Sequence, residues 1–198
     1  MESPLKRKDI PPQRRRQILA AATELFSHSG YHGVTVDAIA QRAGISKGNL
    51  YWYFKSKQEI FQLLFDDLAE RLFLPSQEIL ESDMPPWEKL RDVTRSLLAN
   101  AEANPEAISL ILQIAGQREL SKIVSSSYSL WMRNYIDSLM PLFTAMGEED
   151  PEGVATLYAA TIDGLMAQVV MGPDIYDREK MTAVLEERFI SFGREQDG

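Results

Sequence analysis

The chain has 198 residues, of which 44% are hydrophobic and 25% are charged, and its formal net charge at pH 7 is −8. This composition is typical of a soluble globular protein and suffices for one large domain or for a small domain joined to a larger one. Because cysteine is absent, the sequence excludes disulfides, thiol catalysis and thiolate metal sites.

The first segment, residues 1–12, is predicted to be a flexible basic arm. Residues 1–60 hold ten Lys/Arg and five Asp/Glu, whereas residues 61–198 hold eleven Lys/Arg and 24 Asp/Glu. Such asymmetry indicates that the basic end faces a polyanion. The arm either contacts DNA or is a plain solvated tail. The sequence shows no secretory signal peptide and no uninterrupted apolar stretch of about 18 residues, so we expect a cytoplasmic protein without a membrane partner.

Residues 14–29 are predicted to form the first helix of a small domain. Apolar side chains recur on one face of this helix. They are Ile18, Leu19, Ala22, Leu25 and Phe26. Gly30 is predicted to end the helix, since glycine commonly stands just past the last turn.

Two short helices follow, joined by a tight turn. Thr35 is predicted to cap the helix VDAIAQRA, and Ser46 to cap the helix KGNLYWYF. Gly44 between them is free to adopt a positive φ. Two short helices joined in this way, with a third packed against them, form a helix-turn-helix, which we assign to residues 13–57.

The helix that begins after Ser46 has two different faces. At about 100° per residue, Leu50 and Phe54 share one face, whereas Gly48 and Trp52 lie on roughly the opposite one. The first pair is predicted to be core. The second pair cannot be buried with it in the same small domain, so it is predicted to face outward.

The outward face has the features of a DNA-binding surface. Gly48 lets the backbone approach a duplex closely, and Lys47 places a cation at the start of the helix, where bases and phosphates are met. Tyr51 and Trp52 can lie against sugar, phosphate or a thymine methyl group. Further phosphate contacts are predicted for Thr35, Lys55 and Lys57. The alternative is that Trp52 packs against the second domain and that the lysines are only solvated.

The stretch from Arg16 to Phe61 resembles the DNA-binding domain of the TetR family of bacterial one-component repressors. The resemblance is carried by a long composite pattern, A…LF…GY…T…IA…AG.SKG.LY.YF.SK. Members of that family are all-helical homodimers of nine or so helices, in which the third helix reads the major groove and a C-terminal domain binds a small ligand that releases the DNA. The resemblance implies DNA contacts at Thr35, Ser46, Lys47, Gly48, Asn49, Tyr51, Trp52 and Lys57. Trp52 departs from the family, which more often has a smaller or less apolar residue there.

The remainder, residues 58–198, is predicted to be a larger helical domain. Its first helix is capped by Ser56 and carries four apolar residues at i, i+4 spacing. They are Ile60, Leu64, Leu68 and Leu72. Further helices are predicted to begin near Pro86 and Pro105, because proline suits the first turn of a helix.

Three long helices follow, predicted over residues 121–146, 154–171 and 178–192. Pro141 is expected to kink or end the first of them. The second is rich in small residues, and these are Ala155, Ala159, Ala160, Gly164 and Ala167. Such residues either let two copies pack closely into a homodimer, as the resemblance implies, or suit a tight monomer core. A dimer would place two recognition helices about one duplex turn apart and predicts a palindromic operator.

Aromatic and methionine side chains form a stripe along residues 128–135. They are either core or the lining of a pocket for a small apolar or aromatic effector. Leucine and isoleucine residues are predicted to face this stripe. Together with it, they give the candidate ligand-binding residues Leu64, Leu68, Leu110, Ile114, Tyr128, Trp131, Met132 and Tyr135.

Other kinds of site find little support. His28 and His32 are the only histidines, and the glycine between them is predicted to end their helix, so we assign no metal site. We likewise assign no cofactor and no enzymatic activity. The sequence therefore predicts an all-α protein, a ligand-responsive repressor whose partners are double-stranded DNA, a small-molecule effector and a second copy of itself. The alternative is a helical ligand-binding or scaffold protein whose helix-turn-helix mediates protein contacts.

Overall fold

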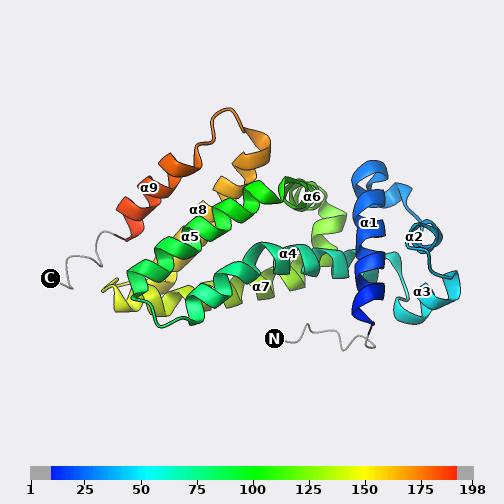
Figure 1. Ribbon diagram of the computed structural model, residues 1–198, viewed down its shortest axis with the longest axis horizontal. Coiled ribbons are helices and arrows are strands. Elements are labelled where there is room, and N and C mark those ends of the chain that lie inside the picture. Colours follow the sequence, from blue (N-terminus) through cyan, green and yellow to red (C-terminus); the bar gives the residue numbers. More distant parts are fainter. Residues whose placement is uncertain (1–9, 191–198) are drawn as a thin grey trace. The chain divides into compact units, whose positions relative to one another are not determined.

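The computed structural model describes residues 10–190, which are helical with short connections and contain no strand (Figure 1). The helices are α1 (Pro12–Gly33), α2 (Val36–Arg42), α3 (Lys47–Tyr53), α4 (Lys57–Glu81), α5 (Pro86–Ala103), α6 (Pro105–Ala115), α7 (Arg118–Ala145), α8 (Pro151–Met171) and α9 (Arg178–Phe189). The predicted all-α class is confirmed. Most of the predicted basic arm and the end of the predicted last helix, Phe192 included, lie outside the described residues.

The chain divides into two compact units, residues 1–67 and residues 68–198. The division falls inside α4, ten residues beyond the boundary expected after Lys57, because the first turns of α4 belong to the core of the first unit. The Phe61 ring lies 5.4 Å from the ring of Phe26 and 4.9 Å from that of Tyr31, both from α1.

The helix ends of the first unit lie where the sequence predicts them. The hydroxyl oxygens of Thr35 and Ser46 each accept a hydrogen bond from the backbone amide three residues later, at 3.1 and 3.2 Å. Gly44, in the turn between α2 and α3, has a φ of +66°. Gly30 has a φ of +67° and interrupts the regular helical backbone of α1. Ser56 accepts a hydrogen bond from the Glu59 amide at the start of α4.

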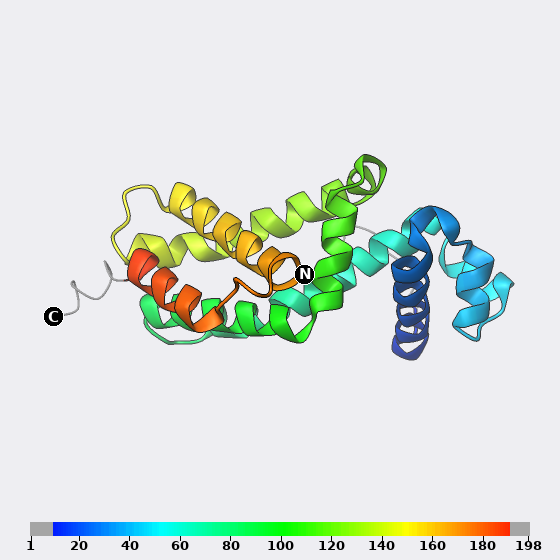
Figure 2. The same ribbon diagram turned by 90° about the horizontal axis from the view of Figure 1, so that it is seen from above.

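The second unit is a helical bundle built around α8. This helix contacts α5, α6 and α7, while α9 packs on α5 (Figures 1 and 2). Pro141 does not end α7, which continues to Ala145. Leu139 and Phe143 on either side of the proline are fully buried. Their packing stabilises the helix against the lost backbone hydrogen bond, which costs about 3 kcal/mol in an isolated helix.

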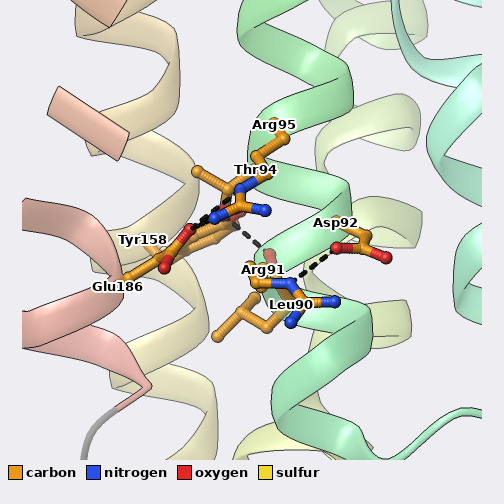
Figure 3. A network of polar contacts seen from close by, with 7 residues as sticks. All are labelled: Leu90, Arg91, Asp92, Thr94, Arg95, Tyr158 and Glu186. Atoms are coloured by element: carbon orange, nitrogen blue, oxygen red, sulfur yellow. Dashed lines mark hydrogen bonds and ion pairs between the residues drawn. The ribbon is translucent and has the colours of Figure 1, made fainter. Parts of the chain in front are cut away.

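Polar contacts connect helices of this bundle. The hydroxyls of Thr94 on α5 and Tyr158 on α8 lie 2.7 Å apart in the buried core (Figure 3). On the surface, Arg95 pairs with Glu186 of α9 at 2.7 Å (Figure 3). Since Thr94 and Tyr158 satisfy each other, they can be buried at little cost.

By length and composition, α8 is also apolar enough to cross a membrane, which corrects the expectation that no segment of the chain is. Tyr158 and Ile162 are completely buried among the neighbouring helices. Of its most apolar 18-residue window, 33% is buried, and the core helix of a helical bundle passes the same test of length and composition as a membrane span.

Candidate nucleic-acid interface and effector site

The two predicted faces of α3 are present in the structure. Leu50 and Phe54 are 0% and 1% exposed, whereas Tyr51 and Trp52 are 44% and 57% exposed. All four residues from Ser46 to Asn49 are exposed as well. The helix thus buries one side in its own domain and offers a continuous row of side chains on the other.

Gly48 lies on this exposed side. A Cβ atom built at this position would meet no other atom within 4 Å. The fold therefore has room for a side chain at position 48, and the folded chain itself does not require a glycine there.

Lys47 and Asp37 connect the exposed ends of α3 and α2. The Lys47 ammonium donates to Asp37 Oδ2 at 2.6 Å and lies 5.7 Å from the centre of the Tyr51 ring. The hydrogen bond and the charge of Asp37 raise the pKa of Lys47. Because both side chains are more than half exposed, a phosphate group can compete with the carboxylate for this cation.

The hydroxyls of Thr35 and Ser46 act as helix caps through their oxygen atoms. Each keeps its own proton for an acceptor outside the protein. Trp52 packs edge-on against Tyr53, with 4.8 Å between the ring centres, and still leaves more than half of its surface exposed.

Lys57 makes contacts within its own domain, and its DNA contact stays a prediction. Its ammonium donates to the carbonyl oxygens of Tyr31 and Val34, at 2.6 and 2.8 Å, and lies 4.2 Å from the centre of the Tyr31 ring. It thus satisfies carbonyl groups at the end of α1. Lys55, by contrast, is exposed, and within residues 10–190 only its backbone amide is engaged, by the Glu59 carboxylate. Of the two lysines, Lys55 is the one free to meet a phosphate.

The eight candidate ligand-binding residues fall into two groups. Leu64, Leu68, Leu110 and Ile114 are at most 4% exposed and belong to the apolar core. Trp131, Met132 and Tyr135 are partly buried, while Tyr128 is 47% exposed. Leu64 belongs to the first unit and the other seven to the second. The structure therefore brings the aromatic residues to one partly open side of α7 but assigns the aliphatic ones to packing.

The chain matches two models of bacterial regulators. The model of bacterial regulatory proteins of the TetR family matches residues 18–64. The model of the C-terminal part of BetI-type transcriptional repressors matches residues 86–191, more than half of the chain.

The chain belongs to the TetR family of bacterial regulatory proteins. The resemblance predicted from the N-terminal pattern is thereby confirmed.

Individual TetR-family proteins agree with this assignment. The chain is 38% identical over 93 residues to the HTH-type transcriptional repressor KstR2 of Mycolicibacterium smegmatis, a match that covers 47% of this chain and 44% of that protein. It thus spans about half the length of the curated relatives it matches. A TetR-like transcriptional regulator from Rhodococcus sp. RHA1 superposes with a TM-score of 0.67 at 26% identity, over 96% of this chain and 100% of that one. The transcriptional regulator FadR from Bacillus subtilis, in complex with stearoyl-CoA, superposes with a TM-score of 0.71 at 24% identity, over 89% of this chain and 98% of that one.

Within the TetR fold of this chain, sequence reasoning missed one polar residue of the second unit. Asp163 stands in the middle of the apolar helix α8, and its Oδ2 accepts a hydrogen bond from the Tyr128 hydroxyl at 3.5 Å. Burial raises the pKa of Asp163 to about 6, against the smaller opposing effect of this hydrogen bond. A carboxylate that is the only charged group in the mostly apolar 16-residue stretch LYAATIDGLMAQVVMG was the signal that could have identified it.

Proposed function

We propose that the chain is a ligand-responsive, DNA-binding transcriptional regulator, specifically a repressor that a small effector releases from a palindromic operator. The observation that carries this proposal is the outward face of α3. That face exposes a lysine, a glycine, two small polar residues and two aromatic rings, while the opposite face is fully buried. A helix of this kind in a helix-turn-helix is suited to lie in the major groove of DNA.

The proposed DNA contacts comprise base contacts on α3 and phosphate contacts around it. The residues are Thr35, Ser46, Lys47, Gly48, Asn49, Tyr51, Trp52 and Lys55. On binding, Lys47 exchanges Asp37 for a phosphate, so its ion pair keeps the ammonium in position while the protein is free. Lys57 is left out of this set because its ammonium is engaged by two carbonyl groups.

The proposed homodimer uses the exposed side of α8 together with α9. Leu157 and Met171 of α8 are 61% and 76% exposed, and Val184 of α9 is 43% exposed. Ala160 and Gly164 lie between the two α8 residues and are exposed as well. An exposed apolar face with small residues at its centre is suited to close helix packing across a two-fold axis.

The effector is proposed to bind in the second unit, near the aromatic residues of α7. The FadR structure shares this fold and is a complex with stearoyl-CoA, which supports a ligand role for the domain. To act as an inducer, the ligand must bind the conformation without DNA more tightly than the one with DNA. We further propose that the protein acts in the cytoplasm, where its DNA is, and that it has no catalytic activity or cofactor.

The proposal is tested with the full chain and random-sequence DNA duplexes. We expect selection of a palindromic site, which is then confirmed by footprinting. Lys47→Ala is expected to weaken binding to this site by about tenfold and to reduce the salt dependence by about one phosphate contact. The matched control is Lys122→Ala, which removes an exposed lysine from α7 and should leave binding unchanged.

Two results would contradict the proposal in different ways. If Lys47→Ala and Tyr51→Ala both bind like the wild type, α3 is not the recognition helix. If the wild type selects no duplex at all, the helix-turn-helix serves protein contacts, and the scaffold alternative is correct.

A further inference from the structure

Two polar groups on α7 and α8 are incompletely satisfied. Among the described residues, the Asp163 carboxylate accepts a hydrogen bond only from Tyr128, and at 3.5 Å this bond is at the long limit. The hydroxyl of Tyr135 is buried and has no hydrogen-bond partner among the described residues. Buried polar groups in native proteins are nearly always satisfied, so an external partner is expected here.

The neighbouring hydroxyl groups do not supply that partner. Thr94 donates its proton to the Leu90 carbonyl at 2.7 Å, so in the 2.7 Å contact between Thr94 and Tyr158 the donor must be Tyr158 (Figure 3). This chain of bonds ends on the backbone of α5. The Tyr135 hydroxyl interacts with that of Tyr158 closely enough to affect its pKa, but because the Tyr158 proton goes to Thr94, this contact gives the Tyr135 oxygen no donor.

Tyr128 and Tyr135 are seven residues apart in α7, so their side chains share one face. Burial, and then the nearby Tyr158 and Asp163, raise the pKa of Tyr135 well above its usual value, so that this residue is a neutral phenol. Burial similarly raises the pKa of Tyr128. With a pKa of about 6, Asp163 is ionised at neutral pH, and the cluster consists of one carboxylate and two neutral phenols.

The chemistry of these three groups defines what can bind them. The Asp163 carboxylate only accepts hydrogen bonds, so the group that binds it must be a donor, and the phenol oxygens can accept from the same donor. Asp163 repels anions, and the surplus of acidic residues in the range 61–198 adds to that repulsion. A cation, by contrast, also gains from the faces of tyrosine rings.

We propose that Asp163, with the hydroxyls of Tyr128 and Tyr135, binds the protonated amino group of an apolar effector. The ammonium group donates to the carboxylate and to the two phenol oxygens, and it thereby bridges α7 and α8. The apolar part of the molecule lies against the partly buried aromatic side of α7. This inference rests on the proposed function, since it specifies the chemistry of the effector.

The test uses three probes with the same eight-carbon chain, namely n-octylamine, n-octanol and octanoate. Binding to the full chain at neutral pH is measured by isothermal titration calorimetry. We expect the amine to bind about tenfold more tightly than the alcohol, because a charged hydrogen-bonded group is worth more than a neutral one, and octanoate to bind most weakly. Asp163→Asn should abolish the preference for the amine while leaving octanol binding unchanged.

Tyr135→Phe and Asp137→Asn complete the set of variants. Tyr135→Phe removes a single oxygen and should weaken only amine binding, which provides a test even if Asp163→Asn does not fold. Asp137→Asn neutralises an exposed carboxylate on α7 and should preserve the preference for the amine. The inference is overturned if the wild type binds octylamine no more tightly than octanol, or if the preference survives in both Asp163→Asn and Tyr135→Phe.

DNA binding by the same preparation separates this inference from the proposed function. A wild-type protein that selects a palindromic site but does not prefer the amine disproves only the amine site. A protein that prefers the amine, loses that preference in Asp163→Asn and selects no DNA disproves the regulator proposal while the amine site stands.

Discussion

Gly48 and Lys57 illustrate how single residues of the first unit divide between binding and folding. The space around Gly48 is open, so the fold gains nothing from the absence of a side chain there. Lys57, which the sequence pattern assigns to DNA, instead bonds two backbone carbonyl groups of its own domain. Both residues belong to the same family pattern, but the fold accounts for the lysine and does not account for the glycine.

Gly48→Ala separates folding from DNA binding. Alanine stabilises a helix by about 0.5–1 kcal/mol relative to glycine, so the free energy of unfolding should stay the same or rise. Operator binding should weaken, because the new methyl group holds the helix away from the duplex. Urea denaturation and a mobility-shift titration measure the two quantities. Operator affinity equal to that of the wild type would show that the backbone of α3 does not approach the DNA closely.

Lys57→Met should destabilise the protein. The variant keeps most of the apolar stem but leaves the Val34 carbonyl without the lysine donor and the Tyr31 carbonyl with only the 3.4 Å hydrogen bond from the Val34 amide, which costs about 1–3 kcal/mol. The measurement is the free energy of unfolding from urea denaturation. Lys55→Met is the matched control, since that lysine is exposed. Equal stabilities of the two variants would contradict the structural role of Lys57.

The helix ends of the first unit could be predicted residue by residue because they depend on local chemistry. Thr35 and Ser46 bond to amides three residues away, and Gly44 supplies the positive φ of the turn. A window of a few residues contains all of this information. The partners of Lys57, in contrast, lie 26 and 23 residues away in the chain, and no periodicity indicates them.

The positions of the long helices of the second unit could be predicted from the sequence, but their continuity and the exposure of their side chains could not. Pro141 was expected to kink or end α7, yet burial of Leu139 and Phe143 keeps the helix continuous. Periodicity placed Tyr128 and Tyr135 on the same stripe, but Tyr128 is 47% exposed whereas Tyr135 is partly buried. Which part of a stripe is covered depends on the helices that pack against it, and a single sequence does not contain that information.

At the scale of the whole molecule, the uneven distribution of charge along the sequence follows the division into two units. The basic surplus falls in the helix-turn-helix, and the acidic surplus in the larger helical unit. An overall negative charge is therefore compatible with DNA binding, because the field near the recognition helix depends mainly on charges within about 10 Å in physiological salt. Net charge alone would have argued against the DNA partner that we propose.

The proposed homodimer leads to a prediction about assembly. Leu157→Glu places a carboxylate in the exposed apolar face of α8, and a two-fold axis would bring two such charges together. We expect sedimentation to shift from dimer to monomer and operator binding to weaken. Leu130→Glu is the matched control, because Leu130 is an exposed leucine of α7. If both variants sediment like the wild type, the α8 face is not the dimer interface.

The placement of the three tryptophans has a practical consequence. Trp52 is 57% exposed on α3 in the first unit, whereas Trp87 and Trp131 belong to the second. A water-exposed indole emits at longer wavelength than a buried one, and stacking on bases quenches its emission. Replacing Trp87 and Trp131 with phenylalanine would leave one intrinsic fluorophore, located on the face that we propose meets DNA. The protein would then report occupancy of its recognition helix optically, without any attached dye.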